Sequence, residues 1–170
     1  MRTMSTIGFT LFISIFFAAG FGILGYGLYS LRASRLAKDW PTAEGKVVSC
    51  EIKTSSDSEG TTYRAVVKYS YAVAGRTYQG DRIAFGYAGD SRHSTHQDIV
   101  ERLSSAKTVL VRYDPAEAAR SVLSYGLNRS TIYFLIFGVT WLLFVTGFTV
   151  LWCVSLRSDA GILTTLVTTR

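Results

Sequence analysis

Two long segments without charged side chains lie near the ends of the chain, and a more polar segment lies between them. No charged residue occurs between Arg2 and Arg32, and none occurs between Arg129 and Arg157. A helix rises about 1.5 Å per residue and the bilayer core is about 30 Å thick, so roughly 20 apolar residues are enough to cross it. The pattern therefore predicts two transmembrane helices with short tails. The expected boundaries are a tail at 1–6, a first helix at 7–31, a second helix at 131–156 and a tail at 157–170.

The first apolar segment has a second interpretation, which is a cleaved signal peptide. Arg2 supplies a positive start, and Ala18, Ala19 and Gly20 would suit a cleavage site. Signal peptides have an apolar core of about 7–15 residues, whereas this segment continues to Leu31. We therefore expect an anchor that is retained. The second segment is not expected to be the core helix of a soluble protein, because too little chain remains to cover an apolar helix on every side.

Residues 32–129, with a core at 40–124, are expected to form a small β-rich domain between the helices. The clearest alternation places one set of residues on a single face of a long strand, namely Tyr63, Ala65, Val67, Tyr69, Tyr71 and Val73. Ala74 and Gly75 then turn the chain into a hairpin, since glycine reaches positive φ at little steric cost. Further strands are expected at 46–52, 76–83, 108–113 and 121–123. The predicted fold is a membrane α protein in which two transmembrane helices flank a β-sheet or partial barrel of about five strands with one short helix.

The connections in this domain are expected to be polar or rich in glycine. Residues 54–60 are predicted to form a mobile loop. Ser94 to Gln97 have the spacing of a capping box, which predicts a short helix that packs through Ile99, Val100 and Leu103. The segment from Gly80 to Gly89 lacks the Lys and Ser/Thr of a phosphate-binding loop, so a flexible loop is the simpler interpretation.

The net charge of +6 and the pI of about 9.5 raise the question of nucleic-acid binding. The basic residues of the central domain are scattered among acidic ones without a clustered run, which is not typical of a nucleic-acid surface. A solvated face near anionic lipid head groups explains them more simply, so membrane lipids are expected partners. Cys50 lies in the domain and Cys153 in the second apolar segment, so no disulfide framework is expected.

Candidate catalytic and metal-binding residues are few. His93, His96 and Asp98 share a helical spacing, but a zinc site needs three or four ligands, and two exposed histidines near a helix start are the simpler interpretation. Neither histidine has a nucleophile beside it in sequence. We therefore expect no catalytic residue, no cofactor and no metal. Asn128 to Ser130 match a glycosylation acceptor, which we discount because it adjoins the bilayer.

Two sets of residues are candidates for contacts with partners. Tyrosine is enriched at interfaces, and the candidate partner surface consists of Tyr63, Tyr69, Tyr71 and Tyr78. The alternative is that these rings cover a half-buried sheet. In the first transmembrane segment a stripe of small residues would let another helix approach closely, and it consists of Ser14, Ala18, Gly22 and Gly25. This stripe packs either against Gly138, Val145 and Thr149 of the same chain or against a second copy in a homo-oligomer.

Several segments together resemble a known family. They are Trp40, the run Gly45-Lys46-Val47-Val48, residues 69–78, residues 109–115 with their Tyr113-Asp114-Pro115 end, and residues 121–123. The pattern is similar to the bacterial membrane-protein family called domain of unknown function 3592, over nearly the whole chain. One departure is Ser104 to Lys107, which stand where the family often has a proline-glycine step. The resemblance implies a small β-rich domain on two transmembrane helices and no known activity.

These observations favour a non-enzymatic protein of the inner (plasma) membrane whose β domain binds a protein or an envelope component. An immunity protein against a membrane-active toxin is one instance of this hypothesis. The alternatives are a channel or transport subunit, lined by polar residues such as Thr10 and Thr140, and a membrane enzyme of lipid or cell-wall metabolism. The domain at 32–129 is expected outside the cytoplasm, because a domain of this length escapes the positive-inside rule.

Overall fold

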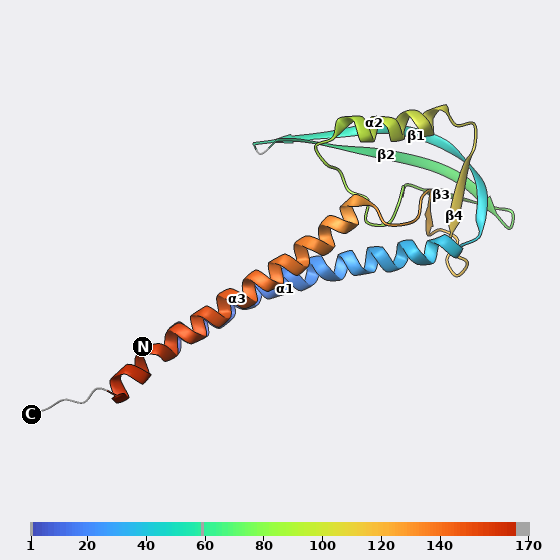
Figure 1. The fold of residues 1–170 in the computed structure, drawn as a ribbon. Helices are drawn as coiled ribbons and strands as arrows, with labels where there is room; N and C mark the ends of the chain where they lie inside the picture. Colours follow the sequence, from blue (N-terminus) through green and yellow to red (C-terminus); the bar gives the residue numbers. More distant parts are fainter. Residues whose placement is uncertain (1, 59, 166–170) are drawn as a thin grey trace, which may run out of the picture. The chain divides into compact units, whose positions relative to one another are not determined.

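The computed structural model describes residues 2–58 and 60–165 of the chain. It contains two compact units, one formed by residues up to Gly25 together with those from Phe134 onward, and one formed by Tyr26–Tyr133. The first is a pair of long helices and the second is a small α+β domain (Figure 1). The predicted fold class is confirmed.

The helical unit consists of most of α1 (Arg2–Leu36) and most of α3 (Arg129–Thr165). Two segments are long and apolar enough to cross a membrane, Ile7–Asp39 and Arg129–Ser155, each with a mean hydropathy of 2.2. Both helices continue past the boundaries expected from the sequence, since α1 runs beyond residue 31 and α3 beyond residue 156. The chain is therefore a protein with two candidate transmembrane helices.

Two glycines allow α1 and α3 to approach each other within the helical unit. A Cβ atom at Gly20 would lie 2.6 Å from the Cδ2 atom of Leu142, and one at Gly138 would lie 3.0 Å from the Cα atom of Leu24. The indole of Trp141 donates a hydrogen bond of 2.9 Å to the carbonyl oxygen of Phe16, which joins the two helices by a polar contact. Such close approach through small residues is how apolar helices gain packing energy in a membrane.

The stripe of small residues does not lie on this contact. Ser14, Ala18, Gly22 and Gly25 are exposed, and no atom comes within 4 Å of the position of a Cβ at Gly22 or Gly25. The expectation that the stripe packs against Gly138, Val145 and Thr149 is therefore corrected. The physical reason is helical phase, because the buried residues Ile13 and Gly20 define a different face of α1.

The α+β domain contains one open antiparallel sheet in the order β3-β2-β1-β4-β5. Its strands are β1 (Thr42–Asp57), β2 (Gly60–Val73), β3 (Arg76–Gly80), β4 (Val109–Tyr113) and β5 (Ser121–Val122). A turn of 3₁₀ helix, η1 (Ala37–Asp39), precedes the sheet. The helix α2 (His93–Ser105) lies along β1 and β2, as Figure 1 shows. At the hairpin of β2 and β3, Ala74 and Gly75 have φ of 49° and 77°, which confirms the predicted turn.

Strand β1 is longer than expected, and a β-bulge explains why its pattern is hard to see. The register with β2 shifts between Val47 and Ser49, so that Val48 is an extra residue and its side chain is exposed. The bulge changes which residues point inward, from Gly45 and Val47 before it to Cys50 after it. Residues 54–57, expected in a mobile loop, instead belong to β1 and pair with β2 as far as Gly60. Their polar composition reflects exposure on both faces.

The core of the domain lies on the face of the sheet predicted from the alternation in β2. Val67 and Tyr69 are fully buried and Tyr71 is 3 % exposed. Val111 from β4 belongs to the same cluster, and Leu103 from α2 packs against it. Glycines make room for the rings, since a Cβ atom at Gly80 would lie 2.5 Å from the Cζ atom of Tyr69. The alternation in β2 is thus a core pattern.

Replacing Gly20 by Leu should destabilise the helical pair, because the new side chain would meet Leu142 and Trp141. Overpacking of this kind costs about 1–3 kcal/mol. Gly22→Leu is the matched control, since the same change two residues away meets no atom of the chain within 4 Å. Unfolding in mixed detergent, followed by tryptophan fluorescence, should separate the two variants. Equal destabilisation would contradict the described packing.

Candidate functional site

The start of α3 is capped by a side chain that also holds the loop after β3. The Oδ1 atom of Asn128 accepts a hydrogen bond of 2.9 Å from the backbone N–H of Thr131, which is the geometry of a helix N-cap. Its Nδ2 atom donates a hydrogen bond of 2.6 Å to the carbonyl oxygen of Phe85. Because this amide is engaged and half-buried, the glycosylation acceptor at Asn128 is not available in the folded domain.

Next to this cap, the loop from Asp81 to Arg92 lies tightly against the helix ends of the domain. Gly86 is buried at φ 70°, and a Cβ atom there would lie 2.8 Å from the Cβ of Ser30 and clash with the hydroxyl of Thr131. Ser130 receives a hydrogen bond of 3.2 Å from the N–H of Ala88. Only glycine fits at position 86, so the interpretation of residues 80–89 as a simple flexible loop is corrected.

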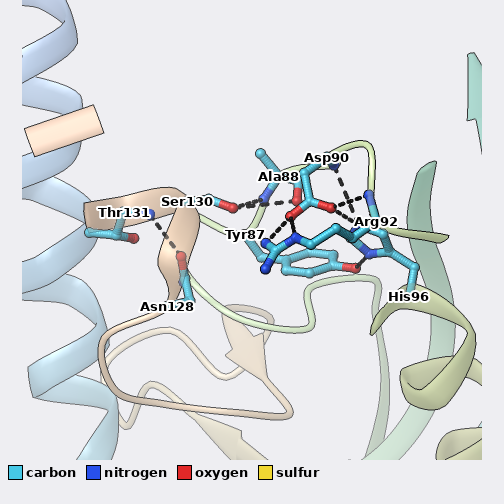
Figure 2. Close-up of polar contacts among 8 residues, drawn as sticks. All are labelled: Tyr87, Ala88, Asp90, Arg92, His96, Asn128, Ser130 and Thr131. Carbon is cyan, nitrogen blue, oxygen red and sulfur yellow. Dashed lines mark hydrogen bonds and ion pairs between the residues drawn. The ribbon is translucent and has the colours of Figure 1, made fainter. Parts of the chain in front are cut away.

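The other end of the loop is held by a polar network around His96 (Figure 2). The Nε2 atom of His96 lies 3.2 Å from Oδ1 of Asp90, and its Nδ1 atom lies 2.6 Å from the hydroxyl of Tyr87. That hydroxyl also receives a hydrogen bond of 3.2 Å from the N–H of Ala65 in β2. Arg92 forms an ion pair with Asp90. The network thus joins the loop, α2 and the sheet.

The protonation of the network follows from the partners of each group. The N–H of Asp90 donates to the carbonyl oxygen of Tyr63 at 3.0 Å, so it does not need Nε2 of His96 as an acceptor. Nε2 can then carry the proton and donate to the carboxylate, while Tyr87 donates to Nδ1. Burial raises the pKa of Tyr87, which keeps it a donor. The hydrogen bonds from Arg92 lower the pKa of Asp90, which keeps it ionised.

A cavity of about 400 Å³ lies between α2, this loop and the residues that lead into α3. Its volume is in the range of about 300–1,000 Å³ found for small-molecule sites. Most of the exposed surface inside it is apolar, contributed by residues that include Ile83, Ile99 and Leu123. Arg92, Arg102 and Arg129 also line it. This cavity is the candidate functional site of the domain.

The tyrosines of the candidate partner surface lie elsewhere and do not act as one surface. Tyr69 and Tyr71 are buried, and their hydroxyls donate to the carbonyl oxygens of Arg82 at 3.1 Å and Ala118 at 2.6 Å. Burial is the main reason that the pKa of Tyr69 rises to about 12. Tyr78 stacks on Tyr71 with ring centroids 5.9 Å apart, and Tyr63 packs edge-on against His93. Tyr69 and Tyr71 therefore cover the sheet, which is the alternative given for these rings, and they do not belong to a partner surface.

The histidines also differ from what their sequence context suggested. Helix α2 begins at His93 rather than at a capping box, and Arg92 at its N-cap position makes no side-chain cap hydrogen bond. His96 is 2 % exposed, so the interpretation of two exposed histidines is corrected for this residue. Within residues 2–58 and 60–165, His93, His96 and Asp98 do not belong to a group of three or more such ligands that could hold a metal.

Sequence reasoning missed the residues that build the site. Asp90, Arg92 and Tyr87 lie in a loop without periodicity, and their partners are distant in sequence or across a turn. A weak signal existed in the Asp90-Ser91-Arg92 spacing, since an aspartate often accepts from a backbone N–H two residues later, as Asp90 does here at 2.8 Å. Arg102 and Arg129 line the cavity only in the folded domain, so the sequence around each of them does not indicate that they share a site.

Comparison with known proteins finds one match. The family model described as domain of unknown function 3592 (DUF3592) matches residues 43–128, which are half of the 170-residue chain. The match begins within β1 and ends at Asn128, so it contains nearly the whole sheet, α2 and the loop that lines the cavity. No curated protein and no solved structure matches the chain.

The ion pair of Asp90 predicts a loss of stability in acid. Because the folded-state pKa of Asp90 lies below its ordinary value of 3.8, its stabilising contribution is present above that value and is lost as the pH falls through the depressed folded pKa. Asp90→Asn should lower the melting temperature at pH 7 and weaken its decline below about pH 4. Asp81→Asn is the control, since Asp81 is exposed and no hydrogen bond or ion pair joins its carboxylate to the described residues. A matching effect of both variants would contradict this role of Asp90.

Proposed function

The chain belongs to the family of domain of unknown function 3592, and since that description assigns no activity, we propose a function from the geometry of its own residues. We propose that it is a non-enzymatic membrane protein whose β domain binds a partner, a protein or an envelope component, at the membrane surface. The observation that carries the proposal is the apolar cavity beneath α2. A cavity lined by apolar side chains and a few charged groups is the usual form of a binding site.

The position of this cavity along the chain supports binding at the membrane surface. Asn128, Arg129 and Ser130 line it, and Arg129 is the first residue of α3 and of its candidate transmembrane segment. Large side chains close to the helix ends of the domain are exposed to solvent in the isolated chain, namely Tyr26, Tyr29, Tyr125, Leu127 and Tyr133. Tyrosines at such positions are typical of the head-group region of a bilayer.

The contacts of His96 suit a structural role. The side chain is 2 % exposed, and its ring nitrogens are engaged with Tyr87 and Asp90, so the imidazole holds the loop on α2.

Two hydroxyls of the helical unit are satisfied within their own helices, which gives no support to a pore lined by them. The hydroxyls of Ser14 and Thr149 donate to carbonyl oxygens of their own helices, at 2.7 and 2.8 Å.

A photo-crosslinking amino acid at Thr95 should capture the partner in native membranes, because Thr95 is exposed and lines the cavity. The same amino acid at Lys46, an exposed residue of β1, is the control. We expect a defined product from Thr95 alone, and we expect Ser124→Phe to remove it by filling the cavity from its rim. Identical products from both positions, or none from Thr95, would reject the proposal.

We propose further that the β domain lies outside the cytoplasm, since it is longer than the loops of about 60 residues to which the positive-inside rule applies. A cysteine at Ser56, which is exposed near the end of the β1–β2 hairpin, should react with a membrane-impermeant thiol reagent in intact cells. The native cysteines are best replaced by alanine. Cys50 is half-buried and burial raises its pKa, so it is a poor reporter, and Cys153 lies in α3. Labelling only after permeabilisation would place the domain in the cytoplasm.

A further inference from the structure

The cavity combines apolar walls with an excess of positive charge at its edge. Ile99 and Leu103 contribute from α2, on the face that also carries His96, and Leu123 contributes from the segment after β5. Leu103 and Leu123 also pack against the core of the domain, but all three side chains are partly exposed, so apolar surface remains open in the cavity. Removal of such apolar surface from water by a ligand favours binding.

The charges around the cavity do not balance. Arg92 is neutralised by its ion pair with Asp90, the one acidic residue in the lining. Arg102 and Arg129 are exposed, and no ion pair in the described part of the chain joins either guanidinium to a carboxylate. The acidic residues of α2 that lie closest in sequence, Asp98 and Glu101, do not line the cavity; they line a neighbouring depression that Arg102 also lines, and neither forms an ion pair with Arg102. Two unpaired guanidinium groups therefore remain for an anionic ligand.

The two arginines are placed where an anionic group of a lipid would lie. Arg129 begins α3, whose apolar run follows at once, and Tyr133 is exposed one turn further along. In a bilayer, basic and aromatic residues at the end of a transmembrane segment lie at head-group level. Arg129 and Ser130 thus bring part of the cavity lining to the start of a candidate transmembrane segment.

We propose that the cavity is a binding site for an anionic membrane phospholipid. The upper part of an acyl chain lies against Ile99, Leu103 and Leu123, and the phosphate receives hydrogen bonds from Arg102 and Arg129. This inference rests on the proposed binding function and names its ligand. A free inorganic anion would leave the apolar walls in water, and a zwitterionic lipid such as phosphatidylcholine would bring the positive charge of its choline group close to the two guanidinium groups.

The test uses the full-length protein, freed of co-purified lipid in a neutral detergent. Native mass spectrometry measures binding of phosphatidylglycerol and phosphatidylcholine with identical acyl chains, with inorganic phosphate as a competitor. We expect tighter binding of phosphatidylglycerol, little competition by millimolar phosphate, and at least a roughly tenfold weaker affinity for phosphatidylglycerol in Arg102→Gln/Arg129→Gln. Ser124→Phe should weaken the binding of both lipids.

The matched control removes two positive charges elsewhere in the domain. Lys46 and Lys68 are exposed residues of β1 and β2 outside the cavity lining, and Lys46→Gln/Lys68→Gln should bind phosphatidylglycerol like the wild type. Melting temperatures close to the wild-type value show that each variant is folded. Equal binding of the two lipids, or an equal loss in both double variants, would overturn the proposal.

Different results would reject the proposed binding function and the proposed lipid site. If a photo-crosslinker at Thr95 captures a defined protein while the purified protein shows no preference for phosphatidylglycerol, the lipid site is rejected and the binding function stands. If Thr95 gives no product that depends on the cavity and the lipid preference is also absent, both are rejected. A crosslink to phospholipid together with the arginine-dependent preference supports both.

Discussion

The α+β domain lies in the chain between two candidate transmembrane helices, and its arrangement depends on how its first and last segments are closed together. The Oγ atom of Ser34 in α1 donates to the carbonyl oxygen of Gly126 at 2.6 Å and accepts from its N–H at 2.9 Å. Gly86 fills the space beside Ser30 and Thr131, where any side chain would clash. Small residues and a paired backbone group thus join the two helix ends, next to a small apolar cluster of Ala33, Ala37, Phe85 and Val122.

Hydrogen bonds also fix the loop that lines the cavity. In the loop from Asp81 to Arg92, Phe85 and Ala88 are bonded to Asn128 and Ser130, while Tyr87 and Asp90 are bonded to His96. These directional hydrogen bonds fix the middle of the loop beside α2. The helix in turn is fixed by Leu103 on the sheet. A rigid frame around a partly empty apolar space is the arrangement that binding sites require.

The sequence was sufficient for features that depend on long regular patterns. The two apolar helices, the alternation of β2 and the turn at Ala74 and Gly75 all follow from periodicity and backbone preference. The structure differs from the predictions where one extra residue changes which side chains of a strand face inward, or where a contact joins residues that are distant in sequence. Val48 shifts the inward-facing set of β1, and residues 54–57 are polar because both faces of the hairpin end meet solvent. The burial of His96 depends on Asp90 and Tyr87, which no local pattern connects with α2.

The first turn of α3 both holds the loop and lines the cavity. Thr131 is buried beside Gly86 and Ser130 holds Ala88, so these residues fix the helix start to the loop. Arg129 precedes them by one or two positions, and successive residues of a helix are about 100° apart, so its side chain remains free to line the cavity. The turn that lines the cavity is therefore also the turn that joins the domain to the rest of α3.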